Sequence, residues 1–98
     1  PDIVTKLIES KFIPVIAPVG IGEDFEAYNI NADLVAGEAA AALKAEKLIM
    51  LTDVEGIKDK EGNLIKSIAR RDLSGLIEDG TISGGMIPKV KACEIALT

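Results

Sequence analysis

The segment Lys47–Thr52 (KLIMLT) restricts the possible folds more than any other part of the sequence. After its first residue it is almost continuously apolar. Such a run is typical of a strand in a parallel sheet, because helices cover both faces of that kind of sheet. A second short apolar run, Val15–Ala17, follows Pro14, which restricts strand pairing to the beginning of its segment. We therefore predict two buried strands in a largely parallel sheet.

Helical patterns alternate with these two strands along the chain. Four segments have the periodicity and the start or stop residues of helices: Asp2–Lys11, Asn31–Lys44, Asp72–Glu78 and Pro88–Leu97. Between them, Val19–Ile30 is predicted to be a loop or small hairpin, and Gly56–Ile68 carries turn residues typical of a hairpin. This order predicts an α/β fold. Because no repeat or linker interrupts it, we expect one domain, residues 1–98.

Apolar stripes indicate which face of each helix should be buried. The first helix places Ile3, Leu7 and Ile8 on one face, and we expect that face to pack on the sheet. The second helix has a stripe that should also face the sheet: Leu34, Val35, Ala39, Ala42 and Leu43. Asn31 is a candidate N-cap of that helix, and Gly80 is expected to end the third helix.

The composition excludes several classes of function. The 98 residues include 16 acidic and 11 basic side chains and only three aromatic ones, so neither a basic surface nor a stacking platform for nucleic acid is expected. Histidine is absent and Cys93 is the single cysteine, which excludes a Cys/His zinc site and fits a reducing, cytoplasmic location. No apolar run approaches the roughly 20 residues that span a membrane. We expect small-molecule ligands, with no nucleic acid or membrane as partner.

Ligands of doubly wound sheets bind beyond the carboxyl ends of the strands, so the loops after Ala17 and Leu51 are the informative ones. The first loop leads through Asn29 and Asn31 to Asp33 at a predicted helix start. These side chains either cap the helix or bind a ligand beside its N-terminus. The second loop, Thr52–Gly56, either places an acid against a ribose or a metal-bound phosphate, or merely ends the strand.

A third candidate is the segment Ser83–Lys89 (SGGMIPK). Its paired glycines would let the backbone approach a ligand, and Lys89 follows in the first turn of a helix. The positive end of a helix disfavours a cation there, so Lys89 either faces an anion or is a solvated surface lysine. Known nucleotide motifs are missing, since no phosphate-binding loop of the GxxxxGK[ST] type occurs and Gly20-Ile21-Gly22 lacks the third glycine of the dinucleotide fingerprint.

Four strings in this order resemble the C-terminal half of the acetylglutamate kinases, within the amino acid kinase family. They are IPVIAPVG from Ile13, NINAD from Asn29, LIMLTDVEGI from Leu48 and SGGMIPKV from Ser83. The resemblance implies a three-layer αβα sandwich with a mostly parallel sheet, the carbamate kinase-like fold, of which this chain would be the C-terminal lobe only. It also implies transfer of the γ-phosphoryl group of ATP, with Mg²⁺, to the side-chain carboxylate of N-acetyl-L-glutamate, a step of arginine biosynthesis.

The same resemblance implies roles for individual residues. Lys89 would stabilise charge on the transferred phosphoryl group, Asp33 would hold the catalytic lysines in place, and Asn29 would bind acetylglutamate. The nucleotide-binding residues would be Thr52, Asp53, Val54, Glu55, Gly56, Ile57, Lys58, Thr81, Ile82, Ser83 and Met86. No residue is expected to bind a metal directly.

The N-terminal lysine and the glycine-rich loops of the family have no counterpart here. We therefore expect the isolated chain to bind nucleotide without turnover, and the full-length enzyme to be a homo-oligomer. Two alternatives remain open: another member of the family, similar to glutamate 5-kinase, or a non-catalytic nucleotide-binding module.

Overall fold

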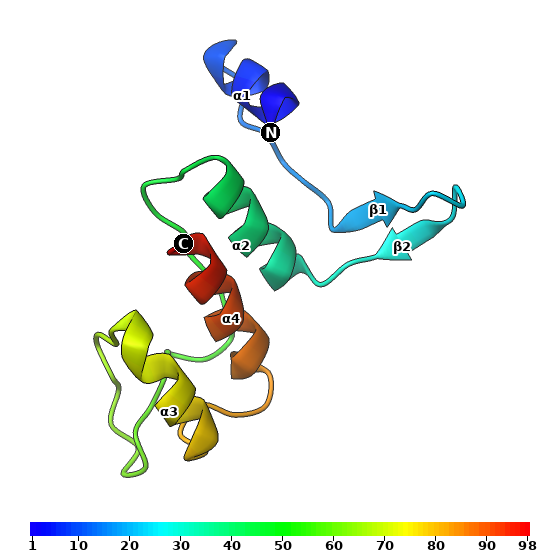
Figure 1. Cartoon of the computed structure of the whole chain (residues 1–98). Helices are drawn as coiled ribbons and strands as arrows, with labels where there is room; N and C mark the ends of the chain where they lie inside the picture. Colours follow the sequence, from blue (N-terminus) through cyan, green and yellow to red (C-terminus); the bar gives the residue numbers. More distant parts are fainter.

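The structure is a computed structural model that describes all 98 residues. Its elements are, in order, α1 (Asp2–Glu9), β1 (Val19–Ile21), β2 (Ala27–Asn29), α2 (Ala32–Ala42), the 3₁₀ turn η1 (Arg70–Asp72), α3 (Leu73–Glu78) and α4 (Met86–Ala96). Figure 1 shows α1 and the β1–β2 hairpin standing away from the group formed by α2, α3 and α4. The four helices and the first hairpin therefore lie where the sequence predicts them, within about two residues at most ends. None of the helices is long and apolar enough to cross a membrane.

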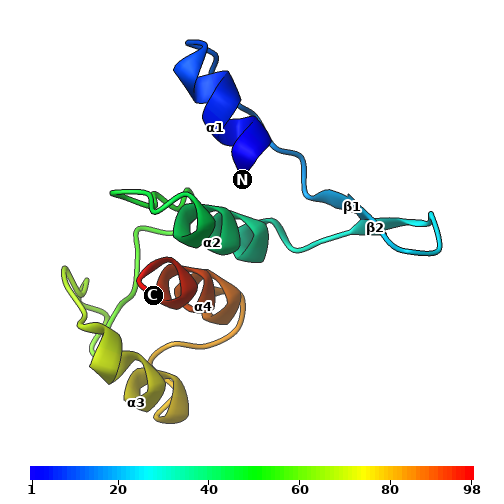
Figure 2. The same cartoon turned by 45° about the horizontal axis from the view of Figure 1, so that its top comes forward.

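The helices α2 and α4 pack side by side (Figures 1 and 2). The buried residues of α2 are Gly37 and Ala40, and Gly37 lies against the buried Ala92 of α4. The main hydrophobic cluster lies between α4 and α3, and its buried residues are Leu73, Ile82 and Val90. Small residues between α2 and α4 allow close approach, and the larger residues on the other side of α4 hold α3 against it.

The β1–β2 hairpin pairs Val19 with Asn29 in antiparallel register. The hydroxyl of Tyr28 donates a hydrogen bond to Asp24 Oδ2 (2.7 Å), and the backbone N–H of Glu26 donates to Asp24 Oδ1 (3.0 Å). The hydrogen bond from Tyr28, followed by that from Glu26, lowers the pKa of the Asp24 carboxyl from its usual range. The same bond to Asp24 raises the pKa of the Tyr28 hydroxyl.

The second predicted hairpin is also present, though it is reduced to a short ladder. Lys58 and Leu64 form a single antiparallel bridge, and the N–H of Ile65 donates to the carbonyl oxygen of Ile57 at 2.8 Å. At its turn Gly62 has a φ of 85°, in the left-handed region that favours glycine. The helix end predicted at Gly80 is confirmed, because that residue follows α3 with a φ of 82°.

The two predicted buried strands are absent, and this part of the prediction is wrong. Val15–Ala17 and Lys47–Thr52 run as extended chain without strand pairing, and Val15 and Leu51 expose 92% and 88% of their surface. The only sheet is the two-stranded antiparallel one formed by β1 and β2. A strand satisfies its backbone N–H and C=O groups only beside another strand, and no other strand lies next to these segments.

The apolar faces of α1 and α2 are predicted to pack on the parallel sheet. Because that sheet is absent, both faces are open. No residue of α1 is buried. The predicted stripe of α2 lines an apolar groove of about 420 Å³ between α1 and α2, which includes Val4, Ile30 and Leu34.

The predicted α1 residues Ile3, Leu7 and Ile8 are 73%, 38% and 50% exposed. The residues that α2 buries are Gly37 and Ala40, outside its predicted stripe. The expected packing of both faces on a sheet is therefore wrong for this chain, because no sheet among its elements covers them.

The overall dimensions lead to the same conclusion. The radius of gyration is 15.8 Å, whereas a compact domain of this length has about 13 Å. The accessible surface is 7726 Å², roughly 2,400 Å² more than expected for a compact monomer of 10.3 kDa. Large apolar side chains of the extended segments and of α1 are among the exposed ones, including Val15, Ile49 and Ile3 at 92%, 77% and 73%.

Candidate functional site

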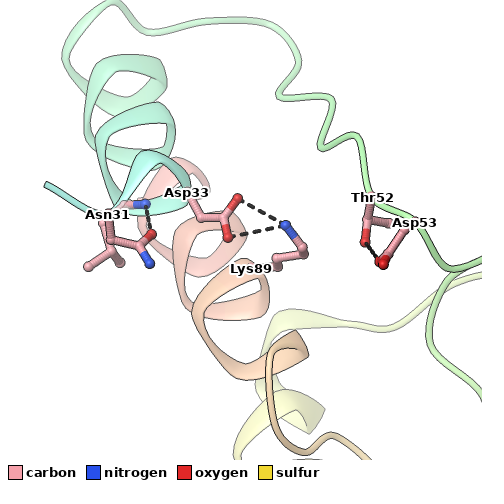
Figure 3. Close-up of polar contacts among 6 residues, drawn as sticks. Asn31, Asp33, Thr52, Asp53 and Lys89 are labelled. Carbon is pink, nitrogen blue, oxygen red and sulfur yellow. Dashed lines mark hydrogen bonds and ion pairs between the residues drawn. The ribbon is translucent and has the colours of Figure 1, made fainter. Parts of the chain in front are cut away.

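Asp33 and Lys89 form an ion pair that joins α2 to α4. The ammonium Nζ of Lys89 donates to both carboxylate oxygens of Asp33, at 3.1 and 3.2 Å (Figure 3). Only 23% of the Lys89 side chain and 24% of the Asp33 side chain is exposed. The lysine is therefore mostly buried and faces an anion of this chain, the Asp33 carboxylate.

The local structure of α2 places Asp33 at the start of the helix. Asn31 is the N-cap, and its side-chain Oδ1 accepts a hydrogen bond from the N–H of Leu34 at 3.1 Å. The predicted capping role of Asn31 is thus confirmed. Because Asn31 satisfies the first turn, the carboxylate of Asp33 is free to bind Lys89.

The start of α4 is set by the glycines before it. Gly84 has a φ of 56°, a left-handed conformation that favours glycine, and its carbonyl oxygen accepts a hydrogen bond from the N–H of Ile87. No side chain caps this helix at Gly85. Pro88 lies in the first turn, where its missing N–H costs no hydrogen bond. The N–H of Met86 likewise donates to the carbonyl oxygen of Ser83 at 3.2 Å, so the first turn of α4 is closed by backbone hydrogen bonds beside Lys89.

The electrostatics of the pair follow from the two helix starts. Asp33 lies at the positive end of α2, which favours a carboxylate. Lys89 lies near the positive end of α4, which disfavours an ammonium group unless an anion is close. Asp33 supplies that anion, so the pair compensates one unfavourable charge while holding Nζ at a fixed place.

A cavity of about 310 Å³ lies next to Lys89. It is lined by Thr52, Asp53, Val54, Ser83, Gly85, Met86 and Lys89. Figure 3 shows Lys89 between Asp33 and the Thr52–Asp53 segment. The hydroxyl of Thr52 donates to Asp53 Oδ1 at 3.4 Å. Residues 52–54 and residues 83–89 at the start of α4, about 30 residues apart in the sequence, thus meet at this cavity.

The chemistry of the lining fits a ligand that is both polar and anionic. The partly desolvated ammonium of Lys89 at this cavity attracts a phosphate group. The carboxylate of Asp53 and the hydroxyls of Thr52 and Ser83 can bind hydroxyl groups, while Met86 and Val54 offer apolar contact. The volume is at the lower end of the range for small-molecule sites, about 300 to 1,000 Å³.

The predicted site residues fall into two groups. Those that the structure brings together at the cavity or at the adjacent ion pair are Asp33, Thr52, Asp53, Val54, Ser83, Met86 and Lys89. Those that lie outside the cavity lining are Asn29, Glu55, Gly56, Ile57, Lys58, Thr81 and Ile82.

The residues outside the lining have definite places of their own. Asn29 is the last residue of β2 and is exposed. Lys58 forms an exposed ion pair with Glu55 at 3.1 Å. Ile82 is 1% exposed in the hydrophobic cluster and its N–H donates to the carbonyl oxygen of Leu76, so only its own carbonyl oxygen remains for a ligand. The N–H of Thr81 donates to Asp79 Oδ1 at 2.9 Å.

Gly85 lines the cavity, although it is missing from the predicted nucleotide-binding set. The paired glycines in Ser83–Lys89 were the signal that could have identified it, because a residue without a side chain lets backbone approach a ligand. No three acidic or cysteine side chains gather closely enough to hold a metal ion.

Comparison with known proteins gives close relatives. The chain is 67% identical over 97 residues to an acetylglutamate kinase of Geotalea daltonii, and 70% identical over 87 residues to that of Geotalea uraniireducens. These matches cover 99% and 89% of this chain but 33% and 30% of the relatives. The chain therefore spans about a third of the length of the curated relatives it matches.

A solved structure has the same path. The crystal structure of smu.665 from Streptococcus mutans UA159 matches 97% of this chain and 38% of its own chain, with a TM-score of 0.90 and 32% identity. The extended segments and open faces therefore occur in a conformation that a longer chain also adopts. The family model described as the amino acid kinase family matches residues 1–98. From these matches and the motifs at its cavity, the chain is a member of the amino acid kinase family.

Proposed function

We propose that this chain is the ATP-binding part of an acetylglutamate kinase, an enzyme that transfers the γ-phosphoryl group of ATP to the side-chain carboxylate of N-acetyl-L-glutamate in arginine biosynthesis. The observation that carries the proposal is the Lys89–Asp33 ion pair beside the cavity lined by Thr52, Asp53 and Ser83. Phosphoryl transfer needs positioned charge more than covalent chemistry, and a fixed ammonium beside a cavity of about 310 Å³ supplies it.

Each group at the site has a place in this reaction. The ammonium of Lys89 stabilises the charge that develops on the transferred phosphoryl group, and Asp33 holds that ammonium in position. The cavity residues Thr52, Asp53 and Met86 bind the ribose and adenine, and Glu55–Lys58 and Thr81–Ser83 surround the nucleotide. Mg²⁺ arrives bound to ATP and supplies further neutralisation of the phosphates.

Asn29 is proposed to bind acetylglutamate. It lies two residues before the N-cap Asn31 and four before Asp33, so β2 leads directly to the start of α2 beside the ion pair. Its exposed amide is not used by the helix cap, which leaves it available for a substrate carboxylate or amide.

We propose further that this chain is the C-terminal lobe of a three-layer αβα sandwich. The support is physical: two apolar segments are extended but unpaired, and the apolar faces of α1 and α2 are open. In a polypeptide of the relatives' length, strands from the additional residues would pair with Val15–Ala17 and Lys47–Thr52 and cover both helix faces. The expected assembly is a cytoplasmic homo-oligomer.

The experiment is a phosphoryl-transfer assay on a chimera, in which this sequence replaces the matching 97 residues of the Geotalea daltonii enzyme. ADP release is measured with acetylglutamate, glutamate and UMP as acceptors, in the presence of ATP and Mg²⁺. Turnover with acetylglutamate, and with neither glutamate nor UMP, supports the proposal. Turnover with glutamate would indicate the glutamate 5-kinase-like alternative, and a folded chimera that binds ATP without any turnover would indicate a nucleotide-binding module.

A further inference from the structure

Gly37 lies in the middle of α2 and is buried against α4. A Cβ atom placed on it would lie 2.5 Å from the carbonyl oxygen of Ala92, 2.9 Å from its Cα and 3.0 Å from its carbonyl carbon. All three atoms belong to the backbone, so no side-chain rotation could relieve the contact. Glycine is a poor helix former, and its use at this position therefore points to the closeness of the two helices.

The contact between Gly37 and Ala92 is one helical turn from the ion pair. Gly37 is four residues after Asp33, and Ala92 is three residues after Lys89, so each lies on the same helix face as the charged residue before it. The contact that only glycine allows is thus one turn from the Asp33 and Lys89 side chains, on the same helix faces. Ala40, a second small buried residue of α2, lies about one turn further along.

We propose that Gly37 is a positioning residue for phosphoryl transfer: it sets the separation of α2 and α4 at which Asp33 holds the ammonium of Lys89 beside the cavity. This inference rests on the proposed function. A methyl group at position 37 pushes the helices apart, because carbon and oxygen atoms of different residues do not approach to 2.5 Å. The lysine then either leaves Asp33 or follows it away from the cavity. A displacement of about 1 Å at a reacting group is enough to lower a rate about 100-fold.

The first test compares Gly37→Ala with Gly75→Ala in the chimera. Gly75 is a glycine of α3 with no atom near the place of an added Cβ, so its substitution controls for the change from glycine to alanine in a helix. For Gly37→Ala we expect kcat to fall at least ten-fold while the KM for ATP changes less than three-fold. For Gly75→Ala we expect both to stay unchanged. A Gly37→Ala chimera with normal kcat would overturn the proposal.

The second test is a rescue that a purely structural role would not produce. Asp33→Glu lengthens the acid by one methylene group, which should lower kcat when Gly37 is present. Combined with Gly37→Ala, the longer acid can reach Lys89 across the wider gap, and kcat should recover at least three-fold relative to Gly37→Ala alone. Equal losses from Asp33→Glu in both backgrounds would contradict the proposal.

If Gly37→Ala does not fold, Ala92→Val provides a wedge at the same contact. Ala92 is 0% exposed and lies against Gly37, so the added methyl groups have no free surface beside them. A fall in kcat, again reversed in part by Asp33→Glu, is expected, and unchanged kcat would overturn the proposal. Thermal unfolding of each variant shows whether the measured protein is folded.

A crystal structure of the Gly37→Ala or Ala92→Val chimera separates this inference from the proposed function. We expect a wider spacing of α2 and α4 and a displaced Lys89 Nζ relative to Thr52. An unchanged Nζ position would overturn the positioning role even if acetylglutamate kinase activity is present. Absence of turnover in the unsubstituted chimera would instead overturn the proposed function, and the displacement would still decide the positioning role.

Discussion

Replacing Lys89 by methionine in the chimera should have two separable effects, one on stability and one on rate. At 3.1 Å the attraction between Lys89 and Asp33 is worth about 1 kcal/mol in water and about 5 kcal/mol at an effective dielectric constant of 20. Desolvation of both groups offsets much of this. Because each side chain is about one quarter exposed, we expect a cost of about 1–2 kcal/mol, between exposed pairs and fully buried ones.

The effect on rate should be larger. Loss of one well-placed electrostatic donor typically costs about 100-fold to 1,000-fold in kcat, equivalent to about 2.7–4 kcal/mol. Methionine keeps the length of the side chain and its packing, so the lost charge is the principal change. The assay is ADP release at saturating ATP and acetylglutamate, with urea unfolding as the measure of stability.

The double variant Asp33→Asn with Lys89→Met separates the two effects. Removing both charges leaves no unpaired ion. The double variant should therefore lose less unfolding free energy than the sum of the losses in Asp33→Asn and Lys89→Met. Its kcat should remain as low as that of Lys89→Met. Lys91→Met, which removes an exposed lysine from the same helix, is the control and should change neither. Near-normal kcat for folded Lys89→Met would refute the assignment of Lys89 to the reaction.

Three further predictions concern Asn29, the isolated chain and the hairpin. Asn29→Ala in the chimera should raise the KM for acetylglutamate about 10-fold or more, because a hydrogen bond to a charged group is lost, while the KM for ATP should change little. The control Asn31→Ala should instead lower the free energy of unfolding by about 1 kcal/mol through loss of the helix cap. Equal rises in both KM values for Asn29→Ala would argue against substrate binding. The isolated 98-residue chain should bind ATP weakly in calorimetry and release no ADP with acetylglutamate, and steady turnover would contradict this. Because hydrogen bonding lowers the pKa of Asp24 and raises that of Tyr28, the bond stabilises the hairpin above the ordinary Asp pKa of about 4 and below the ordinary Tyr pKa of about 10. NMR shifts of β1 and β2 should show hairpin loss as the pH falls through the lowered pKa of Asp24 or rises through the raised pKa of Tyr28, and Tyr28→Phe should remove the alkaline loss.

The helices and turns could be predicted from the sequence because their signals are local. The cap at Asn31 and the left-handed Gly80 depend on residues within one turn, and both are present. The strands could not be predicted in the same way. An apolar run such as Lys47–Thr52 indicates that its side chains tend to be buried. Its backbone can form a strand only by hydrogen bonding to a second strand, which can lie far away in the sequence.

The candidate site was predictable to a different extent at each position. Thr52, Asp53, Ser83 and Lys89 meet at one cavity, which their places after an apolar run and at a glycine-led helix start suggested. The partner of Lys89 was not predictable from spacing, since 56 residues separate it from Asp33. Gly37 gave no signal at all, because its role depends on the backbone of Ala92 in another helix.

The separation of 56 residues between the two charged partners also has a consequence for folding. Closing a flexible loop of that length costs about 3.6 kcal/mol, counting only the part of the chain entropy that depends on loop length. The contacts between α2 and α4 offset this cost only after the loop has closed. The hairpin at Ile57–Ile65 and the neighbouring α3 involve only short loops, so we expect them to become ordered first. In pulsed hydrogen exchange, amides of this region should gain protection before those of α2. A chain that has formed most of its local structure would thus still lack the contact between Lys89 and Asp33, which should form only with the last docking step.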